Sequence, residues 1–309
     1  MKSEFEFIKL LKNKIPRSLQ GEIGIGDDAG CLKLKSCVFL LTSDTIVDGI
    51  DFISKKIKPE LAGRKALAVN LSDIAAMGGQ PKAFVVNLGI PKNFSQSWIL
   101  KFYEGMMNLA GKYKVSCLGG DITSAAEFFS SISILGNSGK KTILRSGAKV
   151  GDWIGVTGKL GGSILGHHAS FEPRIAEGKL LAESGVSSML DISDGLLQDL
   201  EHILESSGKG AVLEVSHIPI TDAAWKLAGN RGALKALEHS VTDGEDFELL
   251  FTASDLVRKK LISLWSRRFS NSPLYWIGRI SPQKKKILWQ LRGKKIASLQ
   301  FTNKGYSHF

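Results

Sequence analysis

Short apolar runs alternate along this chain with segments in which apolar residues recur every three or four positions. The short runs are bounded by Gly, Asp, Ser or Pro, which predicts strands. We expect these strands at residues 37–41, 83–90, 115–118, 128–135, 153–157, 211–215, 248–252, 275–280, 287–291 and 296–301. The helical spacing predicts helices at residues 59–77, 94–113 and 193–206. This alternation restricts the chain to a mixed α/β (α+β) fold.

The chain of 309 residues is long enough for two domains. A polar stretch at residues 137–141 predicts the boundary, so we expect an N-terminal domain at residues 1–138 and a C-terminal domain at residues 146–309. No apolar run approaches the roughly 18 residues of a membrane span, and Glu4 and Glu6 interrupt any export signal. The three cysteines form no C-x-x-C pair, which favours a reducing compartment. We therefore expect a cytoplasmic protein.

The net charge of +11 is concentrated in the last part of the chain. Residues 256–309 contain 13 Lys or Arg and no Asp or Glu. Such a stretch could bind nucleic acid or an anionic membrane. The same stretch carries strand-like apolar runs, so we interpret it as the solvated face of a folded region and expect neither partner.

Seven aspartates lie within the first 121 residues, and several stand beside glycine-rich turns. Asp28 follows the loop GIGD, and Asp44 and Asp121 come at the ends of the runs LLTSD and CLGGD, where we expect strands to end and ligands to bind. Asp73 lies inside an apolar helix, where it fills no cap and lowers helix propensity. Carboxylate oxygens suit Mg²⁺. Each aspartate alone could instead be a turn former or a helix cap.

A second acidic group lies in the segments DISDG and DGEDFE. Asp191 follows an apolar pair at an expected strand end, which makes it a candidate ligand. Ser193 or Asp194 could instead cap the helix that follows.

Groups that could bind an anionic substrate are fewer. Arg145 stands at the expected domain boundary and could either bind a phosphate or form a surface salt bridge. The glycine-rich run VTGKLGGS at residues 156–163 could present backbone N–H groups to an anion, although its spacing does not match a P-loop. The helical spacing of Tyr103 is more typical of a core residue than of one that stacks on a nucleotide.

Seven segments occur in the order GIGDDAG, LTSDT, KALAVNLSDIAAMGGQP, LGGDIT, RSGAKVGDWIGVTGKLG, DISDGLLQDL and GEDFELLF. Together they resemble the thiamine-monophosphate kinase family, of the superfamily that includes aminoimidazole ribonucleotide synthetase and selenophosphate synthetase. The resemblance implies a two-domain α/β protein that forms a homodimer through its N-terminal sheet, with ATP bound between the domains. It also implies a Mg²⁺-dependent enzyme that phosphorylates thiamine phosphate to thiamine diphosphate, with ATP as co-substrate.

The resemblance further implies roles for individual residues. The implied ligands of several Mg²⁺ ions are Asp28, Thr42, Ser43, Asp44, Asp73, Asp121, Asp191 and Asp194. The implied contacts to ATP are Tyr103, Gly120, Asp121, Arg145 and Ser193, and those to thiamine phosphate are Asp51, Glu245 and Tyr306. Arg145, Asp44 and Asp121 are the implied catalytic residues. Asp51 departs from the family pattern, which commonly has histidine at this position.

Other functions remain open at this point. A sister enzyme such as aminoimidazole ribonucleotide synthetase shares single motifs, but DISDGLLQDL together with GEDFELLF is more similar to the kinase. Selenophosphate synthetase needs an early reactive cysteine, and none precedes Cys31. A nucleic-acid-binding protein would use the basic stretch but would leave the N-terminal aspartates without a role. A scaffold that has lost its activity would have no need to retain them.

Overall fold

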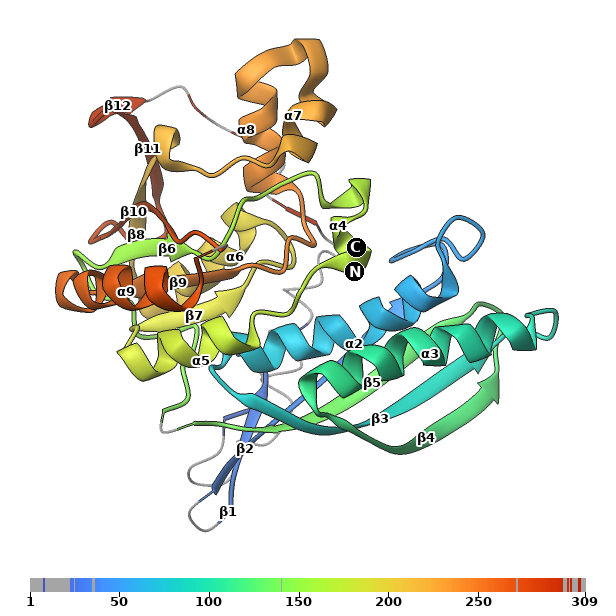
Figure 1. The fold of residues 1–309 in the computed structure, drawn as a ribbon. Coiled ribbons are helices and arrows are strands. Elements are labelled where there is room, and N and C mark those ends of the chain that lie inside the picture. The colour runs from blue at the N-terminus through green and yellow to red at the C-terminus, as the bar shows by residue number, and fades with distance from the viewer. Residues whose placement is uncertain are drawn as a thin grey trace.

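The structure is a computed structural model of the chain, and it describes residues 8, 23–24, 26–34, 37–139, 141–270, 272–296, 299, 301 and 305–306. Two mixed sheets, each with helices packed on it, form the two halves of the molecule (Figure 1). The expected mixed α/β fold is confirmed. Within the described residues, no helix combines the length and the apolar character that crossing a membrane requires.

The N-terminal half is a five-stranded sheet with two long helices on one face (Figure 1). Its strands are β1 Gly30–Leu34, β2 Cys37–Val47, β3 Gln80–Ile90, β4 Ser116–Ser124 and β5 Phe129–Asn137, in the order β1-β2-β5-β3-β4. Strands β3 and β4 are parallel, and the other neighbours are antiparallel. Alternate side chains of β3, namely Phe84, Val86 and Leu88, are buried in the core that the sheet shares with the helices. This alternation follows from the period of two along a strand.

The two helices of this half are α2 (Pro59–Ala76) and α3 (Gln96–Tyr113). They approach closely because each has a glycine at the contact. A Cβ atom at Gly63 would lie 1.8 Å from the carbonyl oxygen of Phe102, and one at Gly105 would lie 1.8 Å from that of Glu60. Helix α2 is buried along almost its whole length, because the C-terminal half packs on its other side.

The C-terminal half is a seven-stranded sheet with helices on both faces (Figure 1). Its strands are β6 Trp153–Val156, β7 Ser188–Asp191, β8 Gly210–Glu214, β9 Leu249–Ala253, β10 Tyr275–Ser281, β11 Ile287–Leu291 and β12 Lys294–Ile296, in the order β12-β11-β8-β10-β6-β9-β7. The helices are α4 His167–Ser170, α5 Ile175–Ser184, α6 Leu196–Ser207, α7 Asp222–Ala228, α8 Gly232–Thr242 and α9 Asp255–Arg268, with short 3₁₀ turns η1 Ser163–Leu165, η2 Val215–His217 and η3 Gly229–Arg231. Side chains of α5 and α9 pack in one core, and those of α6 and α8 in another.

Several elements differ from the sequence-based expectation. Strands β2 and β4 are longer than the expected strands at residues 37–41 and 115–118. Strand β1 and helices α5, α7, α8 and α9 were not expected; α9, for example, buries only Leu261 and Trp265, so its apolar pattern is faint. Strand β12 ends at Ile296, where we expected a strand to begin, so the strand expected at residues 296–301 is not found at the described residues 299 and 301. Residues 297, 298 and 300 lie outside the described part. The two-domain division stays a prediction, and Ala75 of α2 shares a core with Leu181 of α5 across it.

Candidate active site

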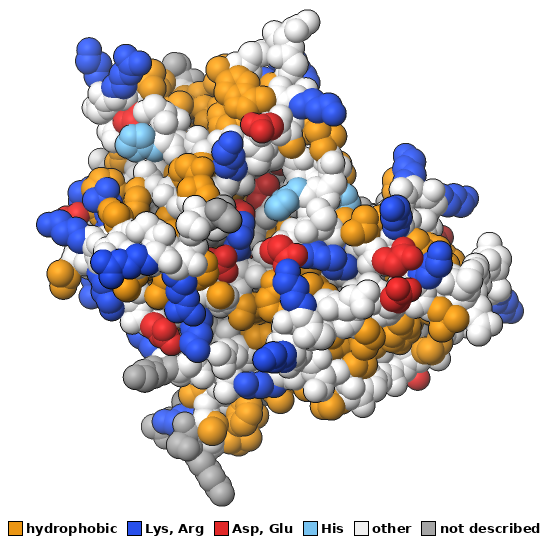
Figure 2. Space-filling model, in the orientation of Figure 1, with side chains coloured by type: hydrophobic (Ala, Val, Ile, Leu, Met, Phe, Trp, Pro, Cys, Tyr) orange, Lys and Arg blue, Asp and Glu red, His pale blue; other side chains and the backbone are white. Residues whose placement is uncertain are grey.

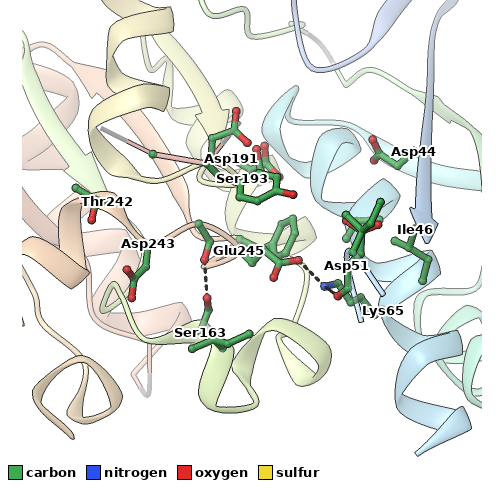
Figure 3. A pocket seen from close by; sticks show the side chains of 18 of the residues that line it. Asp44, Ile46, Asp51, Lys65, Ser163, Asp191, Ser193, Thr242, Asp243 and Glu245 are labelled. Atoms are coloured by element: carbon green, nitrogen blue, oxygen red, sulfur yellow. Dashed lines mark hydrogen bonds and ion pairs between the residues drawn. The ribbon is translucent and has the colours of Figure 1, made fainter. Parts of the chain in front are cut away.

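A cavity of about 950 Å³ lies where the two halves meet, within the size range of small-molecule sites. The predicted site residues among those that line it are Asp44, Asp51, Asp73, Asp191, Ser193, Asp194, Glu245 and Tyr306. In the space-filling view, acidic and histidine side chains lie in the hollow between the halves (Figure 2). The labelled side chains in Figure 3 surround this space from both sides. Folding therefore gathers predicted residues that are far apart in the sequence.

Three carboxylates from distant parts of the chain meet beside this cavity, and two of them, Asp73 and Asp191, line it. Asp28 precedes β1, Asp73 lies in α2 and Asp191 ends β7, and one oxygen from each lies within 4.8 Å of the others. We call these three residues the carboxylate cluster. Thr42 Oγ1 donates a hydrogen bond to Asp73 Oδ2 at 2.5 Å, and Ser72 Oγ donates one to Asp191 Oδ2 at 2.5 Å.

The cluster is electrostatically strained. Burial, followed by the charge of Asp28, raises the pKa of Asp191 to about 7. Burial, followed by the charges of Asp44 and Asp191, raises the pKa of Asp73 well above its ordinary value. Burial also raises the pKa of Asp44 to about 6. Because two carboxylates about 5 Å apart repel by roughly 3 kcal/mol at an effective dielectric near 20, a cation placed among them would be strongly favoured.

One cation of the chain already contacts the cluster. Arg145 Nη2 lies 2.7 Å from Asp28 Oδ1, and the backbone N–H of Arg145 donates to Asp27 Oδ1 at 2.7 Å. The other oxygen of Asp28, Oδ2, is buried and has no hydrogen-bond partner among the described residues. A buried carboxylate oxygen without a partner, next to two further carboxylates, fits a hard divalent cation such as Mg²⁺.

Strand β2 continues past the position where we expected it to end. It runs to Val47, so the expectation that Asp44 ends a strand is wrong. Side chains alternate along the strand, and Thr42 and Asp44 face α2 and the cluster. Ser43 lies on the opposite face, where its Oγ donates to a backbone carbonyl and accepts from Ser133 Oγ at 2.9 Å. The structure thus brings Thr42 and Asp44 to the cluster, but not the hydroxyl of Ser43.

Asp121 also lies within a strand and not at its end, because β4 runs to Ser124. Four residues in register form a row across the sheet from β2 to β4, namely Asp44, Ile132, Val86 and Gly120. Asp121 directly follows Gly120, the last residue of this row. Three strand spacings separate the ends of this row by about 14 Å. A single chain therefore does not place Asp44 and Asp121 on one metal ion.

Gly120 and Tyr103 are likewise outside the residues that line the cavity. A Cβ atom at Gly120 would lie 1.7 Å from the carbonyl oxygen of Val86, and φ there is +155°. The glycine therefore lets β4 pair closely with β3, whatever else it does. Tyr103 is half-buried and packs against the N-terminal core, with its ring centroid 6.4 Å from that of Phe102.

Ser193 and Asp194 lie in the turn between β7 and α6. Neither caps α6 with its side chain. Asp199 Oδ2 instead accepts the backbone N–H groups of Asp194 at 3.1 Å and Gly195 at 3.0 Å. The capping alternative for Ser193 and Asp194 is therefore wrong, and both residues line the cavity.

The residues predicted to contact thiamine phosphate lie at the same cavity. Asp51 Oδ2 accepts the backbone N–H of Val47 at 2.7 Å, so this carboxylate also stabilises the turn after β2. Glu245 forms an ion pair with Lys65 (Figure 3). The backbone N–H of Tyr306 donates to the carbonyl oxygen of Asp194 at 2.9 Å, and Tyr306 is among the residues that line the cavity.

Lys65 is a cavity residue that our interpretation of the sequence missed. It lies in α2, and its side chain is 1% exposed. A charged residue within an apolar helix is the same signal that pointed to Asp73, so the sequence did contain an indication of it.

Within the glycine-rich run at residues 156–163, carboxylates of the chain accept hydrogen bonds from the N–H groups of Gly161 and Gly162. The N–H of Gly161 donates to both carboxylate oxygens of Asp246, at 3.0 and 2.9 Å, and the N–H of Gly162 donates to Asp243 Oδ2 at 3.0 Å. These two N–H groups are therefore not free to bind an anionic ligand. Acidic residues of the segment DGEDFE occupy them instead.

Comparison with known proteins agrees with this geometry. The family model described as AIR synthase related protein, N-terminal domain, matches residues 26–137. A thiamine-monophosphate kinase from Rhodopirellula baltica is 40% identical over 258 residues, which cover 80% of this chain and 81% of that protein. One from Buchnera aphidicola subsp. Acyrthosiphon pisum is 34% identical and covers 99% of each chain. The solved structure "AaThiL complexed with AMPPCP and TMP" superposes with a TM-score of 0.83 at 27% identity, over 99% of this chain and 97% of that one. Because relatives above 30% identity match over essentially their full length, the chain belongs to the thiamine-monophosphate kinase family.

Proposed function

We propose that this chain transfers the γ-phosphoryl group of ATP to thiamine phosphate, which yields ADP and thiamine diphosphate. The observation that carries the proposal is the carboxylate cluster beside Arg145, at a cavity lined by both halves. Family membership supports the reaction, and a relative complexed with AMPPCP and TMP supports a site with room for both reactants.

Mg²⁺ is the proposed cofactor. The residues that would hold it in this chain are the carboxylate cluster with Thr42, Asp44 and Asp194. The buried Oδ2 of Asp28, which has no hydrogen-bond partner among the described residues, and the raised pKa of Asp191 support this assignment. When bound, the metal supplies positive charge that offsets the charge of the phosphate groups.

The chain's own residues would position the reactants. Arg145 would exchange its contact with Asp28 for a phosphate oxygen, and Ser193 would bind ATP from the turn before α6. Asp51, Glu245 and Tyr306 would hold thiamine phosphate. A phosphate oxygen of the acceptor is already anionic near neutral pH, so it can attack the γ-phosphorus in line without an enzyme base. Catalysis would then come from positioning and from charge neutralisation.

A homodimer is part of the proposal, because Asp121 lies about 14 Å from Asp44 in one chain. The sheet face opposite α2 and α3 exposes Leu41, Val85 and Leu135, and the edge strand β4 exposes Leu118 and Ile122. A second copy that covers this surface would bury the apolar side chains. It would also bring its own Tyr103, Gly120 and Asp121 toward the cavity of the first, and so complete the predicted set of ATP and metal contacts.

The test is an assay of ADP release by the purified protein with thiamine phosphate or free thiamine, each with and without Mg²⁺. We expect ADP release only with thiamine phosphate and Mg²⁺, together with formation of thiamine diphosphate. Turnover with the acceptor of a sister enzyme, and none with thiamine phosphate, would contradict the proposed reaction while leaving the fold assignment intact.

A further inference from the structure

Lys65 is a fully buried cation at the edge of the cavity. It lies in α2, two helical turns before Asp73, and its side chain is 1% exposed. Burial of an ammonium group is strongly unfavourable unless every donor has a partner and an opposite charge is close. The contacts of the Lys65 ammonium group therefore indicate its role.

Its ammonium group contacts three different segments of the chain. Lys65 Nζ donates to the carbonyl oxygen of Asp51 at 2.7 Å, contacts His168 Nδ1 at 3.2 Å and pairs with Glu245 Oε1. Burial, followed by the charge of Lys65, lowers the pKa of His168 to about 4, so the ring is uncharged at neutral pH and its Nδ1 can accept the hydrogen bond. Since an ammonium has three donors, all three are engaged within the protein.

Glu245, the acidic partner of Lys65, has an unusual backbone conformation. Its φ is +65°, in the left-handed region that residues with side chains seldom adopt, and its backbone N–H donates to the carbonyl oxygen of Ser193 at 2.7 Å. One carboxylate oxygen is paired with Lys65, and the other lies 3.9 Å from His168 Nδ1. The side chain is 33% exposed and the residue lines the cavity, so part of the carboxylate is open to the cavity (Figure 3).

We propose that Lys65 is a positioning residue for the acceptor substrate, which it serves by fixing the carboxylate of Glu245 at the cavity wall. The proposal rests on the proposed function. Thiamine phosphate carries a cationic thiazolium ring and an aminopyrimidine, and both suit a fixed carboxylate. Lys65 itself cannot donate to a substrate without giving up one of its three protein partners, so it acts through Glu245. Its contacts to Asp51 and His168 join segments from both halves of the molecule around the same carboxylate.

The test compares steady-state kinetics of Lys65→Met, Glu245→Gln and the double variant. The matched control is Lys112→Met, which removes an exposed lysine whose Nζ lies 2.7 Å from Glu172 Oε2, outside the cavity. We expect Lys65→Met to raise the KM for thiamine phosphate by about 10- to 100-fold, with little change in the KM for ATP or in kcat. The double variant should be no worse than Glu245→Gln alone, because the two residues act as one unit. The control should leave both KM values unchanged.

Other outcomes overturn the proposal. An unchanged KM for thiamine phosphate would show that Glu245 needs no such support. Multiplicative effects in the double variant would mean that Lys65 contacts the substrate directly. A joint fall in kcat, in the affinity for both substrates and in Tm would indicate a purely structural role.

A second pair of variants keeps the test valid if Lys65→Met does not fold. His168→Leu removes the acceptor for Lys65, whereas His168→Gln provides one through its amide oxygen. We expect a raised KM for thiamine phosphate in His168→Leu and a smaller rise in His168→Gln; equal values would overturn the proposal. If the wild-type enzyme does not use thiamine phosphate at all, the proposed function fails first and this inference fails with it.

Discussion

Replacing Asp191 with Asn should stabilise the metal-free protein while abolishing its activity. Asp191 is almost completely buried within the carboxylate cluster, where Ser72 Oγ donates to its Oδ2. The amide oxygen of Asn can accept the same hydrogen bond, so the substitution removes a buried charge and little else. It should also relieve repulsion on Asp28 and Asp73.

The size of the effect follows from the raised pKa. An increase from 3.8 to about 7 corresponds to about 4 kcal/mol, at 1.36 kcal/mol for each pH unit. For an acid whose pKa is raised by folding, the destabilisation is absent below the unfolded value, grows above pH 4 and is complete above pH 7. The variant should therefore match wild type near pH 4 and exceed its free energy of unfolding by up to about 4 kcal/mol at pH 8.

The assay is urea unfolding from pH 4 to pH 8 in the presence of EDTA, at constant ionic strength. Asp152→Asn is the control, because Asp152 is also buried but its Oδ2 accepts from the Lys149 N–H at 3.0 Å and from Ser187 Oγ at 2.6 Å. It should give no stabilisation at pH 8. Adding Mg²⁺ should then stabilise wild type more than Asp191→Asn, because the metal binds only where its ligands are assembled. An Asp191→Asn protein that is less stable than wild type at pH 8 in EDTA would refute the view that these carboxylates repel one another in the folded state.

Four further outcomes are expected. Asp44→Asn and Asp121→Asn should each lose activity, and mixing the two inactive proteins under conditions that exchange subunits should restore about a quarter of it, because half of the dimers then hold one intact site; no recovery would argue against a shared site. Arg145→Met should lower kcat/KM for ATP by about 100-fold, the scale of a lost charge-assisted contact to phosphate, whereas an unchanged value would leave Arg145 as a structural ion pair. The pH dependence of kcat should follow ionisation of the acceptor phosphate, so a profile set by an enzyme group would indicate a general base. Gly63→Ala should destabilise the protein by about 1–3 kcal/mol in thermal unfolding, because its Cβ would meet the Phe102 carbonyl, whereas Gly111→Ala in open space on α3 should not.

The sequence by itself identified the residue types of the site and much of the local structure around them. Helix α2 was predicted from its apolar spacing, and Asp73 stood out because a carboxylate inside such a helix has no local use. Asp191 was correctly expected at the end of a strand. These features depend on residues a few positions away along the chain, so the local pattern of apolar and polar residues is enough to predict them.

Only the tertiary structure decided which of these groups meet. It pairs Arg145 with Asp28, which is 117 residues away, and joins Lys65 to Glu245, which is 180 residues away. It also places Asp44 and Asp121 on strands separated by two others, so that one chain cannot bring them together. The spacing of apolar side chains along a helix or strand shows which of its faces is buried, but the packing of the two halves decides which residues that face contacts. Carboxylates and cations cluster in the cavity because that packing, and not any short-range pattern, sets the distances between them.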